Sequence, residues 1–178
     1  MLRSATSFLV LSLVAIQAAV ASTIRPGTYL IQDVRSNLFL GIGPLLPVYP
    51  PMDVPLRLVP EHIASYEKWN VREGDDGGII IFAGKGGPDD YKITSRDNNV
   101  IVSVQKNPET WDAQQVGGGP LVVAIKLPYE DKVFTANGGV YSEVTLQPSI
   151  GGVNQIFRFI PIERDLYHRN RFTFQDTC

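Results

Sequence analysis

The stretch Lys68-Trp69-Asn70-Val71 decides the fold, because its pattern of one large aromatic residue in a short strand-like run returns twice along the chain. It returns as Thr110-Trp111-Asp112-Ala113 and as Ile156-Phe157-Arg158-Phe159. The aromatic positions are 42 and 46 residues apart, and each interval has room for roughly four short strands. The sequence therefore predicts three similar structural units, each ending in a strand that carries a core aromatic residue.

The segments between these aromatic positions have the composition of β-strands. They are short and rich in β-branched and aromatic residues, and no window of about eleven residues after residue 21 keeps helical spacing. Residues that favour turns separate them. The predicted strands are Thr28–Val34, Leu38–Leu40, Ile79–Ala83, Tyr91–Thr94, Val100–Val104, Leu121–Ile125, Lys132–Thr135, Glu143–Gln147 and Ile156–Ile160. We expect an all-β chain of about a dozen strands.

Three units of this size restrict the possible architectures. Each unit leaves part of its hydrophobic face uncovered, so the units must pack together, and three are too few for a propeller, which takes at least about four blades. They resemble instead the β-trefoil, a six-stranded barrel capped by three hairpins. The expected fold is an all-β β-trefoil of three four-stranded repeats. The alternative is an irregular sandwich whose core strands carry the three aromatic residues by chance.

The first 21 residues resemble a secretory signal peptide. Arg3 supplies a positive charge, Phe8–Val20 is almost wholly apolar, and Ala19 and Ala21 are small residues at the positions that direct cleavage before Ser22. The apolar run falls short of the ~20 residues that span a membrane, which disfavours the alternative of an anchor. We expect a secreted, extracellular protein.

Composition and charge limit the remaining possibilities. The chain has 178 residues, of which 44% are hydrophobic and 19% charged, and its net charge is −2. These values suit one folded domain at residues 22–163, followed by a tail at 164–178, and give no reason to expect a nucleic acid or an anionic membrane as partner. Cys178 is the only cysteine, so no intramolecular disulfide can form. We expect a monomer.

The two ends of the predicted domain carry motifs of a known family. The first are Gly27-Thr28-Tyr29-Leu30-Ile31-Gln32-Asp33-Val34 and Leu38-Phe39-Leu40-Gly41, and the last are Val144-Thr145-Leu146-Gln147-Pro148 and Asn154-Gln155-Ile156-Phe157-Arg158-Phe159. Together they resemble the fungal β-trefoil serine protease inhibitors of the cospin type, over residues 26 to 163. The mycocypins, fungal trefoil inhibitors of cysteine proteases, are a weaker match. The relatives are mostly cytoplasmic and have no counterpart of Leu166–Cys178, so localisation and the role of the tail are not implied.

The resemblance implies a function for a segment rich in proline. In cospin-like proteins the inhibitory loop joins the second and third strands of the first repeat, which here corresponds to Ile42–Pro55, named below the proline-rich segment. Its five prolines fix φ near −65° and favour extended geometry in the residues before them, and such stiffening lowers the ordering cost of binding in a protease cleft. The candidate protease-binding residues are Ile42, Gly43, Pro44, Leu45, Leu46 and Pro47.

The segment also indicates which proteases would accept it. It contains no Lys or Arg, so Leu45 or Leu46 suits the hydrophobic pocket of a chymotrypsin- or subtilisin-like enzyme better than the acidic pocket of a trypsin-like one. The basic candidates elsewhere, Lys85, Lys106 and Lys126, are typical of solvated turns. In the alternative interpretation Leu45, Leu46 and Tyr49 pack inward beneath the barrel, because exposed apolar patches are rare in monomers.

A sugar-binding module is the second candidate function. Ricin-B-like lectins share the trefoil and carry Gln-x-Trp in each repeat, which only Gln155-Ile156-Phe157 approaches here, while Glu67 and Glu109 occupy the corresponding positions. A sugar site also needs an acid beside an exposed aromatic residue. The candidates are Asp131 or Asp97 with Tyr129 or Tyr141.

Enzymatic and metal-dependent functions are not predicted. The two histidines, His62 and His168, stand far apart, and there is no Gly-x-Ser-x-Gly nucleophile motif and no phosphate-binding loop around Lys85. We expect no catalytic residues, no metal and no cofactor.

The signal peptide gives a first testable prediction. Protein collected from the culture medium of a secreting host should begin at Ser22, because the small residues at 19 and 21 direct cleavage there. Intact-mass measurement checks this, and a secreted chain that retains Met1 would contradict it.

Overall fold

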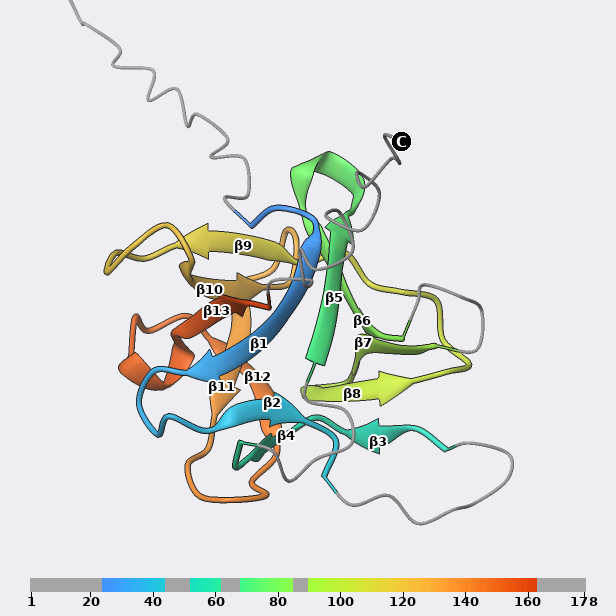
Figure 1. The fold of residues 1–178 in the computed structure, drawn as a ribbon, viewed down its shortest axis with the longest axis horizontal. Helices are drawn as coiled ribbons and strands as arrows, with labels where there is room; N and C mark the ends of the chain where they lie inside the picture. Colours follow the sequence, from blue (N-terminus) through green and yellow to red (C-terminus); the bar gives the residue numbers. More distant parts are fainter. Residues whose placement is uncertain (1–23, 44–51, 62–67, 85–89, 163–178) are drawn as a thin grey trace, which may run out of the picture.

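The structure, a computed structural model, describes residues 24–43, 52–61, 68–84 and 90–162. Within these ranges the chain forms thirteen strands and two short 3-10 helices (Figure 1). The strands are β1 (Gly27–Asp33), β2 (Phe39–Gly41), β3 (Val54–Pro55), β4 (Arg57–Val59), β5 (Lys68–Glu73), β6 (Ile79–Ala83), β7 (Tyr91–Arg96), β8 (Asn99–Ser103), β9 (Asp112–Gln115), β10 (Val122–Lys126), β11 (Lys132–Ala136), β12 (Val144–Pro148) and β13 (Phe157–Pro161). The helices are η1 (Asp75–Gly77) and η2 (Val153–Gln155). The predicted all-β class is confirmed.

Six strands close into a ring. β1 pairs with β5, β5 with β6, β9 with β10, β10 with β13, and β13 returns to β1. The remaining link joins β6 to the residue before β9, where the amides of Ile79 and Trp111 each donate to the other's carbonyl at 2.8 Å. Because the strands meet in a closed barrel rather than two facing sheets, the alternative of an irregular sandwich does not apply.

Three hairpins cap one end of the ring. They are formed by β2 with β4, β7 with β8, and β11 with β12, and each comes from a different third of the chain. Backbone bonds join them to one another: Leu56 donates to Val100, Val144 donates to Leu56, both at 2.9 Å, and Leu146 donates to Asn98 at 2.8 Å. β2, β3, β4 and β8 lie together below the barrel strands β1 and β5 in Figure 1. The cap is thus one hydrogen-bonded layer.

The three aromatic residues that define the repeat lie in the core, as predicted. Trp69, Trp111 and Phe157 are all fully buried. Trp69 Nε1 donates to the carbonyl of Leu40 on β2 at 2.8 Å, and Trp111 Nε1 donates to that of Ile93 on β7 at 3.4 Å. Each indole therefore connects a barrel strand to the second strand of its own unit.

The third unit replaces this hydrogen bond by ring packing. Phe157 has no N–H donor, and its ring meets Phe134 of β11 edge to face at a centroid distance of 6.2 Å. Phe134 also meets Trp111 edge to face at 4.7 Å. Such contacts add to the free energy gained by burial, so the second and third units share one aromatic cluster.

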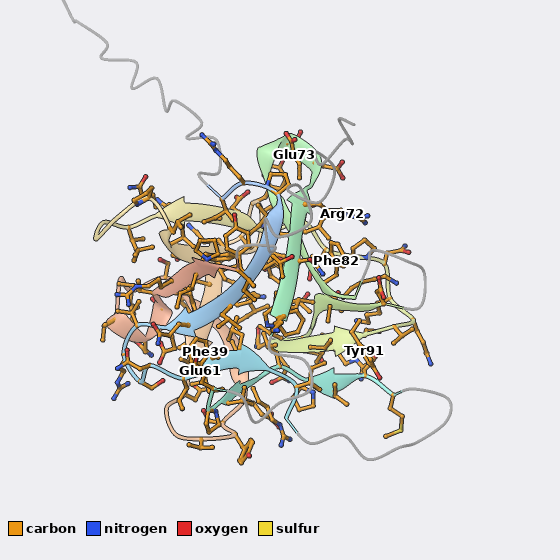
Figure 2. All side chains as sticks on the ribbon, in the orientation of Figure 1. Phe39, Glu61, Arg72, Glu73, Phe82 and Tyr91 are labelled. Atoms are coloured by element: carbon orange, nitrogen blue, oxygen red, sulfur yellow. The ribbon has the colours of Figure 1, made fainter. Side chains whose placement is uncertain are left out.

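A cation–π contact joins two neighbouring barrel strands, β5 and β6. The guanidinium of Arg72 on β5 lies 5.4 Å from the centroid of the Phe82 ring on β6, and both are labelled in Figure 2. Among the described residues no helix is long and apolar enough to cross a membrane.

The nine predicted strands and the two tryptophan-bearing runs overlap observed strands, but the short strands β3 and β4 were not predicted. Most boundaries of the nine predicted strands are shifted by one or two residues. β4 was not predicted, because Pro55 and Pro60 flank its three residues and proline is a signal against strand structure. The short strand β3 even includes Pro55, which pairs at the edge of β8.

The repeat aromatics give a prediction about stability. Phe157→Ala should lower the free energy of unfolding by about 3–5 kcal/mol, because it opens a cavity in the shared aromatic cluster. Trp69→Phe should cost about 1–3 kcal/mol, because the Leu40 carbonyl loses its buried donor. Urea denaturation measures both.

Ile150→Ala is the control for these substitutions. Ile150 is 78% exposed, so its truncation should change stability by no more than about 0.5 kcal/mol. Equal effects of Phe157→Ala and Ile150→Ala would contradict the central role of the aromatic positions.

Candidate functional site

The proline-rich segment begins in the hydrophobic core. β2 ends at Gly41, and Ile42 follows with only 3% of its surface exposed, packed among core residues of the barrel and cap. Gly43 has φ +74°, a conformation that glycine adopts without strain, and the Tyr141 ring lies 3.6 Å from the place a Cβ would take. The Ile42 side chain thus serves packing and is not available to a protease pocket in this conformation.

The other candidate binding residues lie outside the described part of the chain. These are Pro44, Leu45, Leu46 and Pro47. Their role, and the inward packing of Leu45, Leu46 and Tyr49 as its alternative, stay predictions.

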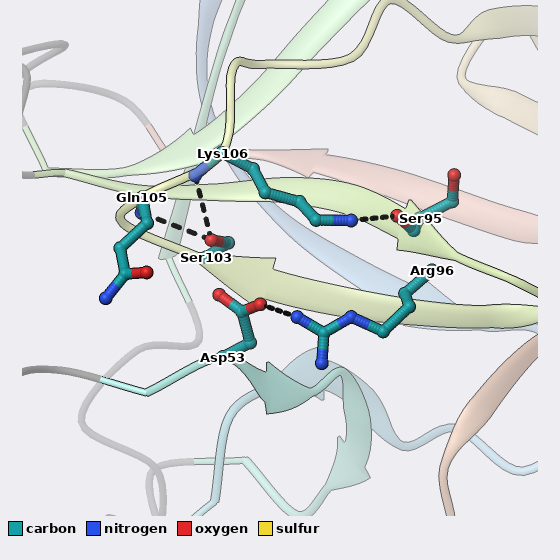
Figure 3. A network of polar contacts seen from close by, with 6 residues as sticks. All are labelled: Asp53, Ser95, Arg96, Ser103, Gln105 and Lys106. Atoms are coloured by element: carbon teal, nitrogen blue, oxygen red, sulfur yellow. Dashed lines mark hydrogen bonds and ion pairs between the residues drawn. The ribbon is translucent and has the colours of Figure 1, made fainter.

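The segment ends on a second, well-paired framework. Met52 is exposed, and Asp53 forms an ion pair with Arg96 at the end of β7 (Figure 3). Val54 and Pro55 then pair with Val102 and Ile101 of β8. The segment is therefore attached to the second third of the chain at this end, although it belongs to the first.

The third part of the chain supports the start of the segment. Tyr141 donates its amide to the Leu58 carbonyl at 2.7 Å, and Leu58 donates back to Ser142 at 2.9 Å. Arg57 and Glu143 add an ion pair at 3.3 Å beside these bonds. This pairing places the Tyr141 ring against Gly43, so all three thirds of the chain contribute to the frame around residues 42–55.

The sequence pattern did not reveal the Asp53–Arg96 pair. The two residues are 43 positions apart and join two different units, which local patterns do not connect. One signal was present, since Asp53 is the only charged residue between Ile42 and Pro55. A lone charge in an apolar segment suggests a partner, but it does not say which.

Of the basic candidates outside the segment, Lys106 forms structural contacts. Lys106 Nζ donates to the Ser95 carbonyl at 2.9 Å, and its amide donates to Ser103 Oγ at 3.0 Å (Figure 3). Lys126 lies at the end of β10, and Lys85 is outside the described residues. Lys106 is thus drawn along the β7–β8 hairpin rather than projecting from it.

The lectin-like motif is also used for structure. Gln155 is buried, its Nε2 donates to Thr135 Oγ1 at 3.1 Å and to the Pro148 carbonyl at 2.9 Å, and its Oε1 accepts from the Ile150 amide at 3.0 Å. These bonds fix the connection between β12 and β13. The amide therefore has no free group for a sugar.

Glu109 takes the equivalent position in the second unit. Its carboxylate accepts hydrogen bonds from Ser95 Oγ at 3.1 Å and Thr94 Oγ1 at 3.5 Å, on β7. Gln155 and Glu109 both stand two residues before a buried aromatic residue and both contact the second strand of their own unit. The position is a repeated structural support.

The sugar-site candidates are arranged differently from the expected pairs. Tyr129 is 92% exposed with φ +63°, and its hydroxyl donates at 2.8 Å to Asp76 in η1, not to a residue of its own unit. Tyr141 packs on Gly43. Asp97, with φ +56°, lies in the tight turn between β7 and β8, and Asp131 lies in the turn before β11.

A metal site would need a group of ligating side chains among the described residues. That part of the chain contains no group of three or more His, Cys, Asp or Glu side chains placed to hold a metal ion. His62 and His168 both lie outside it.

Three solved structures show which proteins share this architecture. A proteinase inhibitor from Coprinopsis cinerea is 20% identical, with a TM-score of 0.65, and the match covers 78% of this chain and 99% of that chain. A ricin B-like lectin from Macrolepiota procera, in complex with lactose, is 14% identical, with a TM-score of 0.60 over 78% and 98%. ThreeFoil, a designed protein with threefold symmetry, is 14% identical, with a TM-score of 0.61 over 76% and 99%. No protein-family model and no curated protein sequence matches the chain.

These likenesses define the class of the protein by its fold. The chain has the all-β fold of the β-trefoil proteins. The resemblance to the fungal β-trefoil inhibitors is confirmed at the level of the fold, which inhibitors and lectins share. The site, and not the fold, must distinguish the two functions.

The contact between Tyr129 and Asp76 gives a prediction on pH dependence. The hydrogen bond to the Asp76 carboxylate, and the negative charge of that group, raise the pKa of Tyr129 above 10.0. Because the pKa is higher in the folded state than in the unfolded state, the contact stabilises the fold below pH about 10 and is lost as pH rises through the folded value.

Ultraviolet titration of tyrosinate in the wild type and in Tyr129→Phe isolates this group. The signal missing from the variant should titrate above the range of free tyrosine, and Asp76→Asn should move it down. A missing signal at the ordinary tyrosine value would contradict the contact.

Proposed function

We propose that this chain is a secreted β-trefoil, built from three four-stranded repeats, that inhibits a serine protease. Between its two anchored ends, the proline-rich segment Ile42–Pro55 is presented to the protease cleft as a stiff, substrate-like loop, and Leu45 or Leu46 fills the pocket that selects the substrate side chain. The protein has no enzymatic activity and needs no cofactor. Because the segment lacks Lys and Arg, the target is a protease with a hydrophobic pocket, of the chymotrypsin or subtilisin kind.

The observation that carries this proposal is the anchoring of both ends of the segment. Before it, Ile42 is buried in the core, and after it, Val54 and Pro55 pair with β8 while Leu56 is fully buried. A segment held at both ends on a rigid scaffold loses little freedom on binding, and this lowers the cost that is subtracted from affinity. Proline at five positions acts in the same direction.

The neighbouring structures support the choice without deciding it. One similar structure is a proteinase inhibitor and another is a lectin bound to lactose. The inhibitor is the better-supported choice here because the side chain of Gln155, the nearest match to the lectin motif, is hydrogen-bonded within the fold, where it holds the β12–β13 connection. A cysteine protease target, as in the mycocypins, and a glycan ligand are outcomes that the following test distinguishes.

The test is a titration of the mature protein against chymotrypsin, subtilisin, trypsin and papain, together with a glycan array. Stoichiometric inhibition of chymotrypsin or subtilisin is expected. Leu45→Asp or Leu46→Asp should weaken it by about a hundredfold or more, because a carboxylate is costly to bury in an apolar pocket.

Two further results set the limits of the proposal. Ile150→Asp, on an exposed residue of another loop, is the matched control and should inhibit as the wild type does. Inhibition of papain alone, or glycan binding without any inhibition, would overturn the proposed serine protease target.

A further inference from the structure

We propose that Arg96 is a positioning residue for the proline-rich segment, and that it acts by holding Asp53 at the point where the segment rejoins the cap. This inference rests on the proposed function, because it concerns how the binding loop is held. Arg96 lies on β7 in the second repeat, whereas the segment belongs to the first. The pair therefore adds a side-chain link between the segment and the second repeat, beside the backbone pairing of Val54 and Pro55 with β8.

The burial of the two partners is unequal, and this decides how much the pair matters. The side chain of Asp53 is 14% exposed, while that of Arg96 is 54% exposed. An ion pair between two exposed groups contributes little, but a largely buried carboxylate depends on its partner to offset the loss of water. Without Arg96, Asp53 would have to turn outward to be solvated.

The remaining oxygen of Asp53 makes the dependence stronger. Asp53 Oδ1 is buried and has no hydrogen-bond partner among the described residues, so Oδ2, which accepts from Arg96, carries the compensation. A buried acceptor that is left without a donor is unfavourable. Loss of the Arg96 side chain would leave both carboxylate oxygens of Asp53 without a donor in this position.

Arg96 is itself placed on a well-fixed strand end. Its backbone pairs with Asn99 across the β7–β8 hairpin, and Asp97 with φ +56° makes the turn between them. The carbonyl of the preceding residue, Ser95, accepts a hydrogen bond from Lys106 Nζ (Figure 3). The Ser95 hydroxyl donates one to Glu109, so the backbone and the side chain of Ser95 are both held. The backbone that carries the Arg96 guanidinium is therefore held by the β7–β8 hairpin and does not depend on the proline-rich segment.

The effect on the loop follows from chain connectivity. Asp53 directly precedes Val54, the first residue of β3, which is paired with β8 over only two residues. A two-residue ladder defines the position of a strand end but leaves the residue before it free to rotate. The ion pair fixes that residue and with it the direction in which the segment leaves the cap.

The test compares four variants with the full-length mature protein. Arg96→Met removes the charge and keeps much of the aliphatic stem, Asp53→Asn removes the buried charge, and Arg96→Lys is the conservative rescue. Lys132→Met is the control, because it breaks an ion pair in which both side chains are exposed, Lys132 with Glu130 at 3.0 Å, in the turn before β11.

The first measurement does not require inhibition. Hydrogen exchange at residues 52–56, followed by mass spectrometry, should be faster in Arg96→Met by about tenfold and unchanged in Lys132→Met, since local opening becomes more frequent. Exchange that is unchanged in Arg96→Met would overturn the positioning role, whatever the protein binds.

The second measurement uses the protease that the wild type inhibits. Arg96→Met should raise the inhibition constant by about tenfold and speed cleavage within residues 42–55, because a looser loop resembles an ordinary substrate. Arg96→Lys should recover most of the affinity. Unchanged inhibition in Arg96→Met would overturn the inference. A wild type that inhibits no protease would overturn the proposed function, and the hydrogen-exchange result alone would then decide whether Arg96 positions the segment.

Discussion

The fold depends on one large aromatic side chain per repeat, buried where a barrel strand begins. Trp69 and Trp111 do more than fill space, because their indole N–H groups bond to the carbonyls of Leu40 and Ile93 on hairpin strands. A barrel and a cap that packed only through apolar contacts could shift relative to each other, whereas a buried directional bond fixes their register. Phe157 connects the barrel to the cap in the third unit by packing its ring against the ring of Phe134. The barrel and the cap consequently share one core.

This coupling explains why the cap can hold a segment of unusual composition. The three hairpins exchange backbone hydrogen bonds through Leu56, Val100 and Val144, so a loop that leaves one of them is braced by the other two. Loops are ordinarily the least ordered part of a domain, and binding loops work best when a rigid scaffold positions their ends. The frame around residues 42–55 has this character, with core packing at Ile42 and strand pairing at Val54.

The same architecture occurs in inhibitors and in sugar-binding proteins. This is possible because core residues stabilise the fold, whereas binding residues lie on loops that can differ. Glu109 and Gln155 take equivalent positions and support the second strand of the second and the third unit. The motif that resembles a lectin signature, Gln155-Ile156-Phe157, serves here as structural support. A shared fold therefore does not by itself assign one of these functions.

The sequence alone determined the all-β class, the spacing of the core aromatics and nine of the strands, because alternation, turn residues and large buried side chains are local signals. It did not reveal β3 and β4, because Pro55 lies in β3 and Pro55 and Pro60 stand on either side of Arg57–Val59. These prolines outweigh the short runs of strand propensity until a partner strand is present. It could not tell that Ile42 faces the core while Gly43 turns under Tyr141, nor that Asp53 meets Arg96 across two repeats. Only the tertiary structure decided these, because they depend on which distant strands close the barrel and which hairpins then meet beneath it.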